Sequence, residues 1–176
     1  MTITIEQKSH GAAFKELIDG FAELENPIYY NIASTKESRS GYVIEISPKN
    51  QPNTKTIRLG VFIKHCSSRR TPWRYSFTLV HQMEMEELKD ECDELFLVLV
   101  AGNDGIACID SLMLKEILDE KYEEMEWISL SRKHRESYRI AGTDGKLSRT
   151  LRKRSFPDLL LDHLNTIYDP GKTLVT

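Results

Sequence analysis

The chain lacks several features that mark whole classes of protein. It has only three cysteines in 176 residues, and no two of them form a C-x-x-C pair. Neither a disulfide framework nor a four-cysteine zinc site is therefore expected. No apolar run approaches the roughly 18 to 20 residues of a membrane span, and the first residues lack the basic and apolar regions of a secretion signal. We expect a cytoplasmic protein with reduced thiols and no membrane association.

The chain also lacks a large excess of either charge, but its charges are unevenly distributed. The formal net charge of −3 predicts no general affinity for nucleic acid or membranes. Residues 84–94 carry seven acids and one lysine, whereas residues 132–154 carry nine bases and two acids. Each run is typical of a solvated face. A basic C-terminal third on a mildly acidic protein is also typical of a protein that binds an anionic partner.

An unbroken apolar stretch, Leu95–Val100, is the feature around which we expect the fold to form. A run of Val and Leu bounded by turn residues predicts a strand that is buried on both faces. The turn residues at 102–105 favour a chain reversal, so Ile106–Ile109 is predicted to return as an antiparallel strand.

The remaining segments predict a mixed α/β order. Hydrophobic spacing predicts a helix over 10–25, and β-prone runs predict strands at 28–32, 42–46 and 57–64. Residues 65–78 are expected on the surface as a loop leading into a short extended piece. We predict one α/β domain with a mixed central sheet flanked by helices. Its parts are an αβββαβ-type core (10–125), a C-terminal β-hairpin and helix (126–168) and a tail (169–176).

Arginines and aromatic residues alternate in the segment that follows the third predicted strand. Guanidinium groups bind phosphate in a bidentate manner, and an aromatic ring can stack on an unpaired base. The alternative is that the tryptophan packs in the core and the arginines pair with the acidic helix. The residues predicted to bind nucleic acid are Arg69, Arg70, Trp73, Arg74 and Tyr75, extended by Arg132, Lys133 and Arg135 if these fold onto the same side.

A carboxylate and a lysine occur on neighbouring predicted strands. Glu45 lies on the second strand and Lys64 at the end of the third, so their side chains could meet at one end of the sheet. Carboxylates can hold Mg²⁺ while a lysine beside them orients a water and stabilises charge on a phosphate. Glu16 or Glu23 on the first helix could complete such a cluster. The alternative is a solvent-facing charge pair at a strand end.

The order helix, three strands, helix, strand over about residues 10–100 resembles the core of the PD-(D/E)XK, or restriction-endonuclease-like, superfamily. The resemblance implies DNA or RNA as partner and Mg²⁺ as cofactor if the protein is catalytic. It assigns Glu45 as the first acid and metal ligand, and Lys64 as the catalytic lysine. Phe62 stands where that family has an acid or a glutamine. This difference implies a weakly active or inactive nuclease.

Two functions follow from these observations. The first is nucleic-acid binding on a nuclease-like scaffold. The alternative is a non-catalytic protein-interaction or inhibitory module, such as an accessory protein of a bacterial defence or toxin–antitoxin system, that binds a protein partner through its acidic helices.

Overall fold

The computed structural model describes residues 2–36, 38–121 and 124–169. It confirms the predicted mixed α/β class. Most of the predicted C-terminal tail, residues 170–176, lies outside these ranges. The helices are α1 (Ile5–Ala22), α2 (Leu79–Glu91), α3 (Ser111–Ile117) and α4 (Ser155–Tyr168). The strands are β1 (Ile28–Ser34), β2 (Gly41–Pro48), β3 (Ile57–Cys66), β4 (Trp73–Phe77), β5 (Glu94–Ala101), β6 (Gly105–Asp110), β7 (Glu126–Ser131) and β8 (Arg139–Gly142).

A five-stranded mixed sheet with the order β1-β2-β3-β5-β6 forms the centre of the molecule. The first three strands, all predicted from the sequence, form an antiparallel meander, and β5 is parallel to β3. The apolar run predicted to be the core strand is β5, which is buried along nearly its whole length. It pairs with β6 through the predicted reversal.

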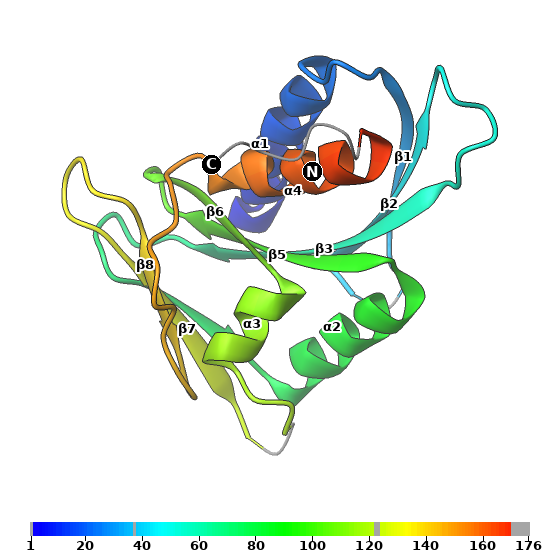
Figure 1. The fold of residues 1–176 in the computed structure, drawn as a ribbon. Coiled ribbons are helices and arrows are strands. Elements are labelled where there is room, and N and C mark those ends of the chain that lie inside the picture. The colour runs from blue at the N-terminus through cyan, green and yellow to red at the C-terminus, as the bar shows by residue number, and fades with distance from the viewer. Residues whose placement is uncertain (1, 37, 122–123, 170–176) are drawn as a thin grey trace.

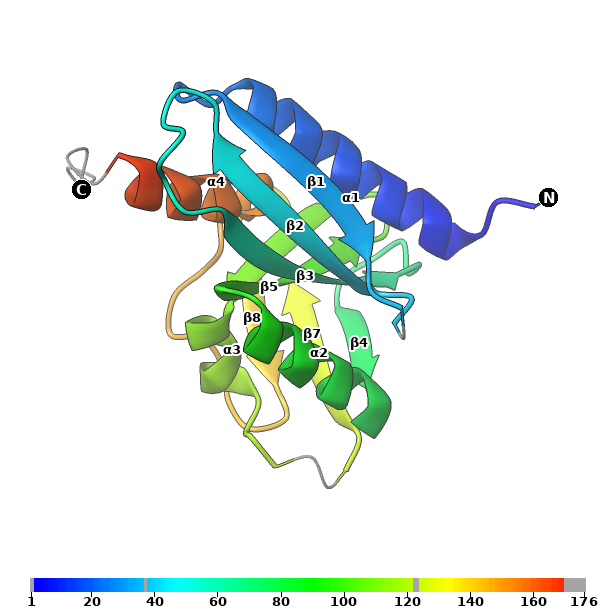
Figure 2. The same cartoon turned by 90° about the vertical axis from the view of Figure 1, so that its right-hand side faces the viewer.

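Each face of this sheet carries its own hydrophobic core. Helices α1 and α4 cover one face, while α2, α3 and a three-stranded antiparallel sheet with the order β4-β7-β8 cover the other (Figures 1 and 2). Successive residues of β3 point into opposite cores: Val61 packs against α1 and α4, and Phe62 faces the smaller sheet. The position that would need an acid in the nuclease-like interpretation is therefore a fully buried core residue.

Side-chain caps set the helix starts. Thr78 begins α2 with a capping box, and Asp110 caps α3 by accepting from the Met113 N–H at 2.8 Å. Helix α1 begins at Ile5, earlier than predicted, because Thr4 forms a capping box with Gln7. The hydrophobic spacing used for the prediction covers only residues 10–25, so it gave no sign of the start of this helix.

Candidate functional site

The two residues predicted to form a nuclease centre lie far apart on the central sheet. Glu45 on β2 is the cross-strand partner of Arg58 on β3, whereas Lys64 lies six residues further along β3. Six residues of extended chain span about 20 Å, whereas Mg²⁺ holds its ligands at about 2 Å. The structure therefore does not bring Glu45 and Lys64 to a shared rim.

Each of these two side chains has a different local partner. Oε1 of Glu45 lies 3.6 Å from Nε of Arg58. Nζ of Lys64 lies 3.4 Å from Nδ1 of His81 and 5.5 Å from the centroid of the Phe77 ring. Burial lowers the pKa of Lys64. Both residues thus link neighbouring elements, Glu45 joining β2 to β3 and Lys64 joining β3 to β4 and α2.

The predicted helix carboxylate does not complete a metal cluster with Glu45. Leu17 of α1 packs in the same core as Ile44, and adjacent strand residues point to opposite faces. Glu45 therefore faces away from α1. Burial raises the pKa of Glu16 on this helix, and the charge of Arg154 partly offsets that effect. Glu16 and Glu45 lie on opposite sides of the central sheet.

The aromatic residues predicted to stack on bases belong to the core. Residues 73–77 form the edge strand β4, and Trp73 is only 4% exposed. Its Nε1 donates to the carbonyl oxygen of Ser68 at 3.0 Å, and the Tyr75 hydroxyl donates to that of Val100 at 3.1 Å. Neither ring offers a face to a base. Strand alternation in this segment places Arg74 on the outer, exposed face.

Arg132, which was predicted to bind nucleic acid, forms a mostly buried ion pair instead. Its Nε donates to Oδ2 of Asp104 at 2.6 Å, and the Tyr138 hydroxyl donates to the same oxygen at 2.6 Å. The Arg132 guanidinium also lies over the Tyr138 ring. The hydrogen bond from Arg132 is the main cause of a lowered pKa at Asp104. This cluster fixes the β5–β6 turn against the end of β7.

The structure brings the two basic segments of the chain together. Strand β4 pairs with β7, so Arg74 lies opposite Ser129. The backbone N–H of Arg132, just after β7, donates to Oγ1 of Thr71, just before β4, at 3.3 Å. Within the described ranges, no ion pair engages Arg69, Arg70, Arg74, Lys133 or Arg135. We call this surface the basic face. It is the outer face of β4-β7-β8 with the loops at one end, and it comprises Arg69, Arg70, Arg74, Trp127, Lys133, Arg135 and Arg139.

Trp127 supplies the exposed aromatic ring of the basic face, and the sequence prediction did not assign it there. It is 45% exposed and opposite Ser76, which places it diagonally from Arg74. The signal is present in the sequence of β7 itself. In that strand Ile128 and Leu130 are the apolar set, so the tryptophan shares the outward face with serines.

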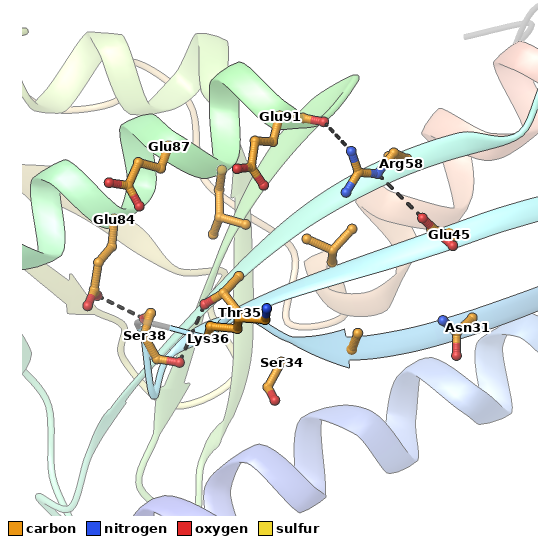
Figure 3. A pocket seen from close by; sticks show the side chains of 13 residues that line it. Asn31, Ser34, Thr35, Lys36, Ser38, Glu45, Arg58, Glu84, Glu87 and Glu91 are labelled. Carbon is orange, nitrogen blue, oxygen red and sulfur yellow. Dashed lines mark hydrogen bonds and ion pairs between the residues drawn. The ribbon is translucent and has the colours of Figure 1, made fainter.

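A groove with an acidic rim lies between α2 and the strands β1 and β2 (Figure 3). Its volume is about 660 Å³. Oε2 of Glu84 accepts from the Ser38 hydroxyl at 2.8 Å, and Arg58 donates from Nη1 to the carbonyl oxygen of Glu91 at 3.1 Å. We call it the acidic groove; its charged lining residues are Lys36, Glu45, Arg58, Glu84, Glu87 and Glu91.

Comparison of the chain with protein-family models, curated proteins and solved structures finds no match. The relationship to restriction-endonuclease-like proteins therefore stays a prediction. None of the helices in the described ranges combines the length and the apolarity that crossing a bilayer would require.

Proposed function

We propose that the protein binds single-stranded nucleic acid on the basic face and does not cleave it. The observation that carries the proposal is the pairing of β4 with β7, which puts both arginine-rich segments on one small sheet. The guanidinium groups of Arg69, Arg70 and Arg74, which have no ion pair among the described residues, can contact phosphates, and the exposed Trp127 ring can stack on an unpaired base. A cytoplasmic location belongs to the same proposal and is in keeping with three free cysteines.

The absence of cleavage follows from the arrangement of the predicted catalytic residues. Glu45 is beside Arg58 rather than beside a second acid, and Lys64 lies about 20 Å further along the sheet. We therefore assign no Mg²⁺ to Glu45. Incubation of the protein with labelled DNA and RNA in Mg²⁺ or Mn²⁺ is expected to leave the strands intact.

Fluorescence anisotropy with labelled oligonucleotides tests the proposal. Single strands are expected to bind more tightly than a duplex of the same length, because a duplex offers no unpaired base to Trp127. Replacing Trp127 by Ala is expected to weaken binding about tenfold, in line with about 1–3 kcal/mol per stacked base. The matched variant Trp127→Phe keeps a ring and should retain most of the affinity. Equal binding by all three proteins, or no binding at low salt, would refute this function.

The acidic groove supports a second candidate function, the binding of a basic peptide segment of a partner protein. Its volume of about 660 Å³ has room for several residues, and three glutamates of α2 face it from one side. Titration with arginine- and lysine-rich peptides tests this candidate. The double variant Glu84→Lys with Glu87→Lys should abolish binding, and a response to the peptides that this variant leaves unchanged would exclude the groove.

A further inference from the structure

Three acidic side chains from separate segments meet at the start of β7. Asp119 follows α3, Glu126 begins β7, and Asp144 lies in the turn after β8. Carboxylate oxygens of the three residues lie within 4.8 Å of one another. Glu126 is only 5% exposed, so water does little to screen its repulsion by the other two. Such a cluster calls for a neutralising proton or cation.

The backbone holds two of these carboxylates in place. The N–H of Asp144 donates to the carbonyl oxygen of Ile117 at 3.1 Å, and the N–H of Asp119 donates to Oδ2 of Asp144 at 2.9 Å. A Cβ on Gly145 would lie 2.2 Å from the carbonyl oxygen of Glu116, so the turn packs tightly on the end of α3. The acids are therefore fixed by the fold and do not depend on mobile surface side chains.

A buried amide oxygen beside the cluster has no partner. Gln82 is 1% exposed, and its Nε2 donates to the carbonyl oxygens of Phe77 and Glu124 at 3.0 and 2.9 Å. Phe77 is the cross-strand partner of Glu126, so the amide group lies near the start of β7, the strand that begins with that acid. Among the described residues, nothing donates to Oε1 of Gln82. Gln82, Asp119 and Glu126 line one small cavity of about 40 Å³, which is large enough for an ion or a water.

The lysines that line the same cavity do not neutralise the three acids. Nζ of Lys115 lies 3.2 Å from Oε1 of Glu120, and Nζ of Lys89 lies 3.9 Å from the same oxygen and 3.5 Å from Oε2 of Glu86. Their charges are matched by other carboxylates. Among the described residues, no lysine or arginine forms an ion pair with Asp119, Glu126 or Asp144, and the ligand atoms that these three residues offer are all oxygens.

We propose that Asp119, Glu126 and Asp144 bind a divalent cation of the calcium class, with Oε1 of Gln82 completing the protein's share of the coordination shell. Calcium takes carboxylate and amide oxygens at about 2.3–2.6 Å, so two ligands on opposite sides of it are about 5 Å apart. The carboxylate oxygens, which all lie within 4.8 Å of one another, can therefore share one such ion. The proposal is independent of nucleic-acid binding.

Terbium luminescence and thermal unfolding test this site on the full chain. Tb³⁺ replaces Ca²⁺ at oxygen sites, and Trp127, the neighbour of Glu126 in sequence, can transfer its excitation to a bound ion. We expect Tb³⁺ emission on indole excitation, displacement of that emission by Ca²⁺, and a rise in the unfolding temperature when Ca²⁺ is added.

Site and control variants decide where the ion binds. Glu126→Gln and the exposed Asp119→Asn should each weaken Tb³⁺ binding about tenfold or more, because each removes a charged ligand. Because Asp119 is exposed, Asp119→Asn is expected to fold even if the buried substitution Glu126→Gln prevents folding. The control variant Glu84→Gln with Glu87→Gln removes two charges from the acidic groove and should bind as the wild type does. Emission and unfolding temperature that do not respond to either ion, or that respond equally in site and control variants, would overturn the proposal.

Discussion

The two sheets of this protein differ in how their charged residues are engaged. On the central sheet, Glu45 pairs with Arg58 and Lys64 contacts His81, so the predicted catalytic residues connect neighbouring elements. On the outer face of the smaller sheet, Arg74 has no ion pair among the described residues and lies near the exposed Trp127. Glu45 and Lys64 of the first sheet thus have local partners, whereas Arg74 of the second has no ion pair among the described residues.

This contrast shows why a charge pattern alone is a weak guide to function. Arg132 and Arg74 both belong to basic segments, yet Arg132 lies in a mostly buried pair with Asp104 and Arg74 is exposed. The difference arises from strand alternation and from which chain segment lies opposite. Both are properties of the tertiary structure.

The largest expected effect separates the two tryptophans. Trp73→Ala should lower the free energy of unfolding by about 3–5 kcal/mol, because it empties a core site and removes a hydrogen bond to Ser68. Trp127→Ala should change it by less than about 1 kcal/mol. Urea unfolding of both variants measures the difference. Equal losses would mean that Trp127 is also a packing residue.

A smaller loss is expected from breaking the Arg132 pair. Asp104→Asn keeps the size of the side chain and removes its charge, and we expect a cost of about 2 kcal/mol because Arg132 and Tyr138 both donate to this carboxylate. Thermal unfolding measures it. The matched variant Asp93→Asn removes an exposed acid that pairs with Lys55 and should cost under about 1 kcal/mol. Similar costs for the two would contradict the role of the Asp104 cluster.

A pH dependence is expected from the buried histidine of α1. Burial lowers the pKa of His10; the charge of Glu6 raises it by a smaller amount, and His65 lowers it slightly further. Nε2 of His10 has no hydrogen-bond partner among the described residues. The unfolded chain therefore binds the proton more readily, so stability falls as pH drops through about 6.5. His10→Gln should reduce that fall in urea unfolding between pH 7.5 and 5.5. An unchanged slope would show that His10 binds protons equally in the folded and unfolded states.

The smallest effect is expected at the predicted catalytic lysine. Lys64→Met should alter the free energy of unfolding by no more than about 1 kcal/mol, because a flexible apolar chain replaces a lysine that burial already disfavours in its charged form. Wild type and variant should both leave labelled RNA intact in Mg²⁺. Metal-dependent cleavage that is lost in the variant would restore the nuclease interpretation.

The sequence was sufficient for the fold class and for most of the elements. The apolar run at 95–100 and the β-prone runs at 28–32, 42–46 and 57–64 are local signals, and each corresponds to an observed strand. No local signal in the sequence shows which strands pair with one another. Residues 73–77 alternate buried and exposed positions, but only the pairing of β4 with β7 shows that Trp73 is enclosed. For the same reason, the 20 Å between Glu45 and Lys64 and the meeting of Asp119 with Asp144 could not be read from spacing.

The salt dependence of oligonucleotide binding tests the central claim, that the basic face is a phosphate-binding surface. Each phosphate contact on a single strand contributes about 0.7 to the slope of log K against log salt concentration. The triple variant Arg69→Ala, Arg70→Ala and Arg74→Ala should therefore reduce the slope by about 2. A control variant of equal charge, with Lys8, Lys15 and Lys49 replaced by Ala, should keep the wild-type slope. A slope that the arginine variant leaves unchanged, or that both variants reduce equally, would contradict the account.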